Sequence, residues 1–415
     1  MKRRAFLKSL AALGGLGLGG CLSDDLMNGV INPCLPGPLP QKLEDHAVVH
    51  QAWEGLDPGL VWDCHVHLAG SGGSGSGAWV NPNMKSILHP VQYVGRKVFL
   101  NGACVTPGAG EDRAYVDHML ALMADFPAGA RLMLLAFDAV YSEKGERDSE
   151  ASPIFTPNAY AERLVSAHPD RFQWLASVHP YRPDCVEVLE EVSAKGARGV
   201  KWLPQAMGIN PASPLCDRFY RAMARLDLPL LSHTGAEHAL HGPAPQSWAN
   251  PLLLRRALDQ GVRVIAAHCS SLGEYVDVDQ GDHGPERPGY ELFYRLLNTP
   301  DYRGRIFGDL AATLNVNRSE AFMKSLFERE AHFPSLLNGS DYPLPGVPFL
   351  LSLGKLERFG LLTGEQSAVL GKIRPYNPLL FDFVLKRTLR WQGRRLPDQA
   401  FETGRFFGAG SVGNV

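Results

Sequence analysis

Short apolar runs alternate with longer amphipathic segments along most of the chain. The helical segments have recognisable ends: Ser213 and Asn250 each precede a proline, an N-cap followed by Pro at the first helical position, and Gly261 marks a helix end. Residues 185–195 carry apolar side chains at helical spacing with charges opposite. Eight apolar runs each end on a polar residue, and they are Leu60–Trp62, Leu132–Phe137, Phe172–Val178, Gly199–Leu203, Leu228–Leu231, Val262–Ala267, Arg305–Phe307 and Leu336–Asn338. Apolar runs alternating with helices predict βαβ units and a parallel sheet, and eight of them predict an α/β fold of the closed (β/α)8 barrel type.

The pattern also divides the chain into segments. We expect a single barrel domain over residues 59–390, preceded by an export signal over 1–21 and a linker over 22–58, and followed by a C-terminal tail over 391–415. Four prolines within residues 33–40 give the linker the composition of a semi-rigid tether. A Gly/Ser segment over 71–77 follows the first strand, where it would be either a flexible lid or an insert without a role.

The first residues resemble a bacterial export signal. Arg3 and Arg4 precede a short apolar stretch, as in twin-arginine signals, and the sequence Leu-Gly-Gly-Cys ends at Cys21, as at a lipoprotein cleavage site. The apolar stretch is too short to cross a hydrocarbon core of about 30 Å as a helix. The resemblance implies an exported protein on the periplasmic side, anchored to the membrane only through a lipidated Cys21.

Composition limits the classes of partner. The chain has 415 residues, 45% of them hydrophobic and 20% charged, with a net charge of -2, which fits a globular protein and not a disordered one. No basic block outside the N-terminus suggests nucleic-acid binding, so we expect a small-molecule partner. The seven cysteines lack the spacing of a disulfide framework, and Cys64 and Cys269 are expected to be buried small hydrophobes.

Histidines and one aspartate follow the predicted strands. His65 and His67 are separated by one residue at the end of the first strand, so both rings point the same way. His233, His268 and Asp341 follow the fifth, sixth and eighth runs. In a barrel the carboxyl ends of all strands meet at one face, so these side chains should converge there. Imidazole and carboxylate accept zinc, manganese, iron or cobalt.

This ordered set, with the segment Gly339–Pro343 (Gly-Ser-Asp-Tyr-Pro), resembles the amidohydrolase superfamily and its amidohydrolase-related branch over about residues 59–388. The resemblance implies that three histidines bind a divalent metal, with zinc expected, and they are His65, His67 and His233. It implies that Asp341 binds metal and handles the proton of the attacking water. His268 would bind a second ion in two-metal members and orient water or substrate in one-metal members.

Lys201 decides between one and two metal ions in this resemblance. It lies at the end of the fourth run, where two-metal relatives carry a carbamylated lysine that bridges the ions. In one-metal relatives an ammonium at this position would face a substrate carboxylate or solvent. Both alternatives stay open on the sequence.

Other polar strand ends are candidates for substrate contacts, namely Asp138, His179, Arg182 and Asp309. Arg182 would be either a clamp for a substrate anion or a solvated side chain. We predict a metal-dependent hydrolase that activates water against a C-N or C-O bond of an amide, ester, lactone or related carbonyl compound. The alternatives are a decarboxylase or hydratase of the same branch and a non-catalytic metal-binding lipoprotein, which would need neither Asp341 nor His268 besides three histidines.

Overall fold

A computed structural model describes residues 31–408 of the chain. The predicted export signal, with Cys21, lies outside this range, as do the last residues of the predicted C-terminal tail. Within the described range no helix is both long enough and apolar enough to cross a membrane.

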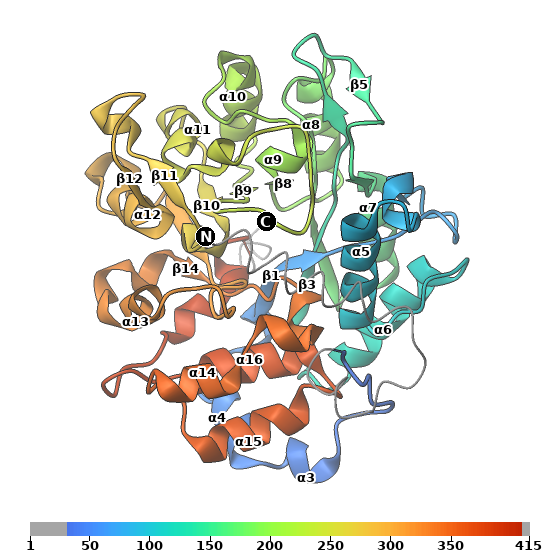
Figure 1. The fold of residues 1–415 in the computed structure, drawn as a ribbon, viewed down its shortest axis with the longest axis vertical. Coiled ribbons are helices and arrows are strands. Elements are labelled where there is room, and N and C mark those ends of the chain that lie inside the picture. Colours follow the sequence, from blue (N-terminus) through green and yellow to red (C-terminus); the bar gives the residue numbers. More distant parts are fainter. Residues whose placement is uncertain (1–30, 409–415) are drawn as a thin grey trace, which may run out of the picture.

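Parallel strands form a closed barrel at the centre of the molecule (Figure 1). The strands are β1 (Trp62–His67), β3 (Arg131–Leu135), β7 (Phe172–Leu175), β8 (Val200–Trp202), β9 (Leu230–Ser232), β10 (Val264–Ala266), β13 (Ile306–Asp309) and β14 (Leu336–Leu337). They pair as a three-stranded sheet, β1-β3-β7, and a five-stranded sheet, β14-β13-β10-β9-β8. Parallel bridges join Ala176 to Val200 and Val66 to Tyr342, so both seams between the sheets are closed. The predicted TIM barrel is confirmed.

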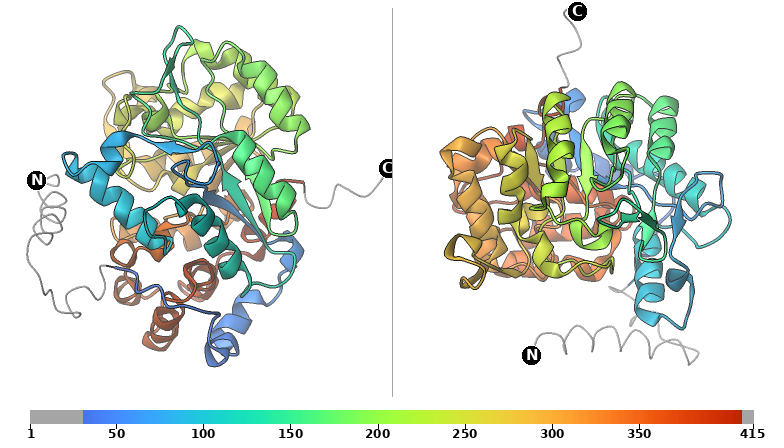
Figure 2. Two further views of the ribbon diagram at one scale, coloured as in Figure 1. Left: turned by 90° about the vertical axis from the view of Figure 1, so that its right-hand side faces the viewer. Right: turned by 90° about the horizontal axis from the view of Figure 1, so that it is seen from above.

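Helices surround the barrel (Figure 2). They are α5 (Pro90–Gly102), α6 (Glu111–Met123), α7 (Asn158–Ala167), α8 (Cys185–Ala194), α9 (Pro204–Met207), α10 (Asp217–Arg225), α11 (Arg255–Asp259), α12 (Gly289–Leu297), α13 (Glu320–Glu328), α14 (Leu353–Arg358), α15 (Gly364–Ile373) and α16 (Pro378–Thr388). The predicted caps are present, because the Ser213 side chain accepts a hydrogen bond from Leu215 N and that of Asn250 accepts one from Leu252 N. Gly261 has a φ of +86°, a conformation that glycine adopts without strain at a helix end.

Short antiparallel strand pairs lie in the loops between these elements. They pair β2 (Trp79–Val80) with β6 (Ile154–Phe155), β4 (Val140–Tyr141) with β5 (Arg147–Asp148), and β11 (Glu274–Val276) with β12 (Glu286–Pro288). The Gly/Ser segment that follows β1 is held to α6, since the Asp112 carboxylate accepts hydrogen bonds from Ser71 N at 2.6 Å and Gly72 N at 3.0 Å. One buried carboxylate therefore anchors the start of this segment to α6.

The N-terminal segment differs from the predicted tether. Within residues 31–58 the chain forms α3 (Gln41–Glu44) and α4 (Ala47–Trp53), and α4 packs on α16. The ring centroids of Trp53 and Phe383 lie 4.2 Å apart, and Val49 is buried beneath them. Prolines suggested a spacer, but the apolar side chains of α4 supply the contacts that fold it against the barrel.

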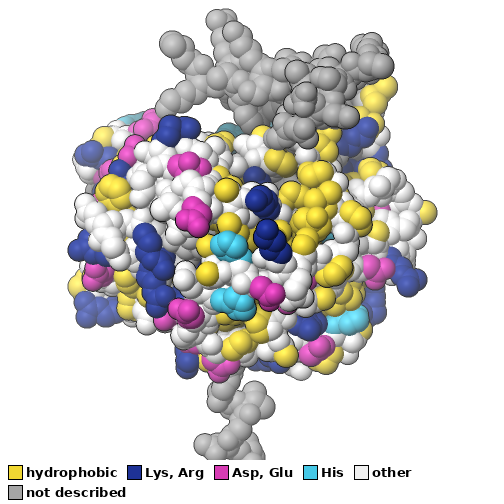
Figure 3. All heavy atoms as spheres, turned by 90° about the horizontal axis from the view of Figure 1, so that it is seen from below, with side chains coloured by type: hydrophobic (Ala, Val, Ile, Leu, Met, Phe, Trp, Pro, Cys, Tyr) yellow, Lys and Arg dark blue, Asp and Glu magenta, His cyan; other side chains and the backbone are white. Residues whose placement is uncertain are grey.

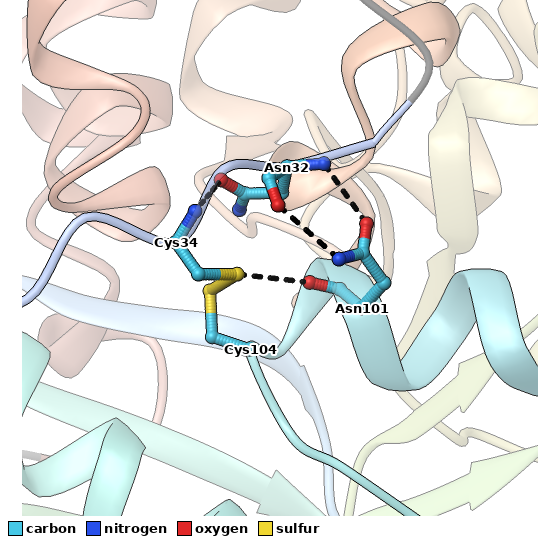
Figure 4. Close-up of a disulfide and its surroundings, with 4 residues drawn as sticks. All are labelled: Asn32, Cys34, Asn101 and Cys104. Atoms are coloured by element: carbon cyan, nitrogen blue, oxygen red, sulfur yellow. Dashed lines mark hydrogen bonds between the residues drawn. A yellow bond between two sulfur atoms is a disulfide. The ribbon is translucent and has the colours of Figure 1, made fainter. Parts of the chain in front are cut away.

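A disulfide joins this segment to the barrel (Figure 4). Cys34 is bonded to Cys104, just after α5 and 70 positions later in the sequence. Beside it Asn32 N donates to Asn101 Oδ1 at 2.9 Å, and Asn101 Nδ2 donates to Asn32 O at 3.2 Å. The prediction from cysteine spacing missed this bond, because two isolated cysteines form no motif.

The C-terminal segment closes the end of the barrel away from the site, so the predicted tail is folded as far as residue 408. Phe406 lies edge-on to Phe307 of β13, with ring centroids 4.7 Å apart, and the Thr403 hydroxyl donates to Trp62 O. The barrel interior above it is apolar, lined by Trp62, Cys64, Met133, Leu135, Leu175, Leu231, Ile265, Ala267 and Leu337. On the face of the molecule that Figure 3 shows, acidic and basic side chains are interspersed, in keeping with the small net charge.

Candidate metal centre

Two histidines of β1 and one aspartate after β14 meet at the carboxyl end of the barrel. His67 Nε2 lies 3.0 Å from Asp341 Oδ1, and His65 Nε2 lies 3.4 Å from the same oxygen. His65 is fully buried, whereas the side chain of His67 is 23% exposed. These three side chains form a group that could hold a metal ion. The seam between the first and the last strand therefore carries the core of the site.

The chain segment around Asp341 is shaped for this contact. A Cβ on Gly339 would lie 2.7 Å from the Cβ of His65, so only glycine fits beside that histidine. Asp341 itself has a φ of 62°, and its backbone N–H donates to His65 O at 2.9 Å. The carboxylate of Asp63 ties the same two segments together, because it accepts hydrogen bonds from Ser340 N at 2.8 Å and His65 N at 3.1 Å. The Gly-Ser-Asp-Tyr-Pro motif is thus a geometric requirement of the site.

Asp309, at the end of β13, orients the histidines. Its Oδ2 lies 2.8 Å from His65 Nδ1, and its Oδ1 accepts a hydrogen bond from His268 N at 2.7 Å. A carboxylate at Nδ1 places the proton there and leaves the Nε2 lone pair free to bind a metal. The sequence placed Asp309 among the substrate contacts, but this fully buried side chain reaches two site histidines instead.

His268 belongs to the cluster, and His233 lies at its edge. The ring of His268 is stacked on that of His65 at 5.1 Å and packs edge-on to that of His233 at 5.0 Å. His65, His268 and Asp309 form a second group that could hold a metal ion. His233 Nε2 lies 3.2 Å from Gly235 O, in its own loop, so its ligand nitrogens stand outside both groups. The structure therefore brings the ring of His233, but not its nitrogens, to the predicted cluster.

Lys201 reaches the same nitrogen of His65 that a metal would use. Its Nζ lies 3.0 Å from His65 Nε2, and the side chain is buried at the end of β8. Burial lowers the pKa of Lys201, while the carboxylates of Asp309 and Asp341 oppose this. Because Nε2 has one lone pair, it can serve either the amine or a metal ion. Lys201 therefore occupies the place from which a carbamate could bridge two ions.

The titration of the cluster favours metal binding. Burial lowers the pKa of His65 and His233 well below the usual range, so both rings are neutral at pH 7. Burial by itself would raise the pKa of Asp341, but His65 and His268 beside it hold that pKa well below its usual value. Neutral imidazoles and an ionised carboxylate are the protonation states in which these groups bind divalent ions. The donor set fits a metal such as zinc.

Two predicted substrate residues are occupied within the fold. His179 is buried, with Nε2 2.9 Å from Met207 O and its ring against Tyr141. Arg182 forms ion pairs with Asp138 at 3.1 Å and Asp184 at 2.9 Å. Both side chains therefore have hydrogen-bond partners within the fold, and neither belongs to the two groups that could hold a metal ion.

Three residues near the cluster were missed by the sequence pattern. Glu237 Oε2 lies 3.6 Å from His233 Nε2, while Arg318 and Tyr275 are buried beside Glu237. Each lies in a loop or small hairpin after a strand and not at the strand end itself. A signal could have been the presence of charged residues four to nine positions beyond strand ends, but such residues are common on any surface.

Comparisons with known proteins agree with this geometry. The chain matches the family model described as Amidohydrolase over residues 62–299, more than half of its length. No curated protein matches it. Similar solved structures include an uncharacterised TIM-barrel protein from Bordetella bronchiseptica, at 15% identity over 75% of this chain and 98% of that one, with a TM-score of 0.46. They also include 5-carboxyvanillate decarboxylase from Sphingomonas paucimobilis, at 12% identity over 75% and 97%, with a TM-score of 0.42.

A third similar structure is 4-oxalomesaconate hydratase from Rhodopseudomonas palustris, at 15% identity over 79% of this chain and 98% of that one, with a TM-score of 0.40. The family assignment rests on the family model, which begins at the first residue of β1 and extends past β10 and α12. The chain belongs to the amidohydrolase family of metal-dependent enzymes.

Proposed function

We propose that the protein is a metal-dependent hydrolase that uses water to cleave a C-N or C-O bond of an amide, ester, lactone or related carbonyl compound. The observation that carries this proposal is the convergence of His65 Nε2, His67 Nε2 and Asp341 Oδ1 at one point. His65, His67 and Asp341 would hold one ion, for which we propose zinc, and His268, Lys201 and a turned His233 complete a set that would suit a second. A divalent ion there lowers the pKa of water from 15.7 to about 7 and polarises a carbonyl oxygen.

The protein's own groups would then handle the protons. Asp341 is ionised at neutral pH and almost fully buried, so it can take a proton from water and return it to the leaving group. Asp309 keeps the Nδ1 proton of His65 in place throughout. The ring of His268 is stacked on that of His65, where it would orient water or the substrate carbonyl.

Exchange of Asp341 for Asn tests the proton-transfer role. Asn keeps an oxygen that can bind metal weakly but cannot accept the proton, so kcat should fall by about 10²- to 10⁴-fold while most of the metal stays bound. His67→Ala should lose metal and activity together. A rate for Asp341→Asn within a few-fold of the parent, at full metal occupancy by elemental analysis, would assign proton transfer to another group.

A panel of amides, esters, lactones and aromatic carboxylates tests the reaction class. Ring opening or ester cleavage supports the hydrolase, whereas release of carbon dioxide from an aromatic carboxylate would replace it by a lyase.

The Lys201→Ala variant tests how many metal ions the enzyme binds. Loss of one ion, with partial rescue of activity by short carboxylic acids, supports a carbamate bridge. An unchanged content of one ion per chain supports a simple ammonium.

We also propose that the enzyme is exported and anchored on the periplasmic side through Cys21. The Cys34–Cys104 disulfide supports export, because such bonds persist in oxidising compartments and are rare in the cytosol. Mass spectrometry of the mature N-terminus tests the anchor, and an intact Met1 on the exported protein would refute it.

A further inference from the structure

Arg318 carries a buried positive charge that no carboxylate neutralises. It follows β13, is 6% exposed, and takes part in none of the ion pairs of residues 31–408. Nε donates to Ser271 Oγ at 2.9 Å and one terminal nitrogen donates to Asn317 Oδ1 at 2.6 Å, and both acceptors are neutral. Buried arginines are almost always paired with an anion. By contrast, the equally buried Arg387 pairs with Asp398.

Arg318 is connected to the turn that carries His268. Burial lowers the pKa of Arg318 to about 10, and the carboxylates of Asp341 and Glu237 act in the opposite direction. Ser271, which accepts its hydrogen bond, belongs to the turn after β10, where Ser271 N donates to His268 O at 3.0 Å. Arg318 is therefore attached to the same turn as His268, on the carboxyl-end face of the barrel.

A buried hydroxyl group stands beside this charge without a partner of its own. Tyr275 of β11 is 5% exposed, and its hydroxyl oxygen forms no hydrogen bond within the described part of the chain. It lies close enough to Arg318 and Glu237 for their charges to act on it. A buried hydroxyl normally has a hydrogen-bond partner. A guanidinium and a hydroxyl are both donors of the kind that a carboxylate accepts from.

The loop that presents Arg318 is fixed in place. Lys355 Nζ donates to Val316 O at 2.8 Å and to Arg318 O at 2.7 Å, and Val316 N donates to Leu350 O at 2.8 Å. Little ordering of this loop would be needed on binding, which favours affinity.

We propose that Arg318 and Tyr275 bind an anionic group of the substrate, so that the enzyme acts on carbonyl compounds that carry a carboxylate. This rests on the proposed function, because the metal centre beside Arg318 would act on the other end of the same molecule. Arg318, and not the ion-paired Arg182, is the anion clamp of this site.

Binding of benzoate and of benzamide, equal in size but different in charge, tests this proposal on the metal-loaded enzyme. Calorimetry should give a preference for benzoate of about 10- to 100-fold, the range for a hydrogen-bonded charge pair. Arg318→Gln should abolish the preference and Tyr275→Phe should reduce it by about 3- to 10-fold, as expected for one hydrogen bond. Arg182→Gln, the matched comparison, should leave it unchanged.

Benzoate could also bind the metal directly, and His67→Ala separates the two sites. If His67→Ala keeps the preference for benzoate over benzamide, binding at Arg318 is supported. If His67→Ala loses this preference and Arg318→Gln keeps it, the proposal is overturned. Loss in Arg182→Gln, or no preference in the parent enzyme, overturns it as well. Should Arg318→Gln fail to fold, an unchanged preference in Tyr275→Phe refutes the proposal. Failure of the hydrolase proposal itself would appear as absence of turnover or metal, which binding of benzoate does not require.

Discussion

Removal of the Asp309 carboxylate should weaken metal binding although His65, His67 and Asp341, the first metal group, stay unchanged. Asp309 Oδ2 holds His65 Nδ1 at 2.8 Å, and Oδ1 accepts from His268 N at 2.7 Å. In Asp309→Ala both donors lose their acceptor in a fully buried place. His65 could then carry its proton on either nitrogen, and the tautomer with a proton on Nε2 cannot bind metal.

The magnitude follows from comparable carboxylate-histidine pairs. Removal of such a partner costs about 10- to 100-fold in metal affinity, which is about 1.4 to 2.8 kcal/mol. Two buried donors without acceptors would also lower the free energy of unfolding by about 1 to 3 kcal/mol each, less where water enters the space. The metal affinity and the stability of Asp309→Asn should lie between those of the parent and those of Asp309→Ala, because the amide group has one oxygen in place of two and can keep only one of these two hydrogen bonds.

Competition with a chromophoric chelator measures the affinity, and denaturant unfolding of the metal-free protein measures stability. Asp382→Asn is the matched control, since Asp382 is a buried carboxylate that pairs with Lys386 at 2.6 Å and reaches no site histidine. It should destabilise the fold and leave metal affinity unchanged. If Asp309→Ala binds metal within two-fold of the parent, or if Asp382→Asn weakens metal binding as much, the orienting role of Asp309 is refuted.

Three further results are expected. Cys34→Ser, which leaves Cys104 unpaired, should lower the free energy of unfolding by about 2 to 4 kcal/mol, and equal denaturation midpoints for the two proteins would contradict this. Gly339→Ala would place a Cβ 2.7 Å from the Cβ of His65, so it should destabilise the fold by about 1 to 3 kcal/mol and reduce metal occupancy; full occupancy at parental stability would contradict it. Hydrogen bonds from two arginines lower the pKa of Asp279 from 3.8 to about 2. The stability that these bonds give is present above pH 3.8 and is lost as the pH falls through 2. Asp279→Asn should therefore flatten the loss of stability in this window, and an unchanged acid profile would refute the assignment.

The parts of the fold that repeat were predictable from the sequence. Most barrel strands are buried on both faces and lie in or beside an apolar run, so the count and order of strands followed directly. The boundaries were less accurate: the first apolar run was placed at Leu60–Trp62, whereas β1 extends from Trp62 to His67 and includes both histidines, as the expected alternation of side chains required. The residues of α4 were hidden because prolines near them suggested a spacer, although only packing against α16 decides that this segment folds.

The metal-binding side chains were predictable because barrel topology places strand ends together. The direction of each side chain was not, since it depends on contacts between loops. His233 turns its Nε2 to Gly235 O, and Arg182 is held by Asp138. Arg318 lies nine residues beyond the end of β13, and no local pattern shows that its loop folds back over the site.

The seam between β1 and β14 has a consequence for assembly of the enzyme. His65 and Asp341 lie 276 positions apart and are brought together by hydrogen bonds along this seam, among them those from Cys64 N to Asn338 O and from Asp341 N to His65 O. A nascent chain without its last strand therefore lacks the first metal group, and a bound ion would link the two ends of the domain only after both have been synthesised. A ligand that binds only the native state stabilises it by about 2.7 kcal/mol at a hundred times its dissociation constant. The supply of metal during biogenesis would thus govern how much of the newly made protein stays folded, with its barrel closed, and so escapes proteolysis.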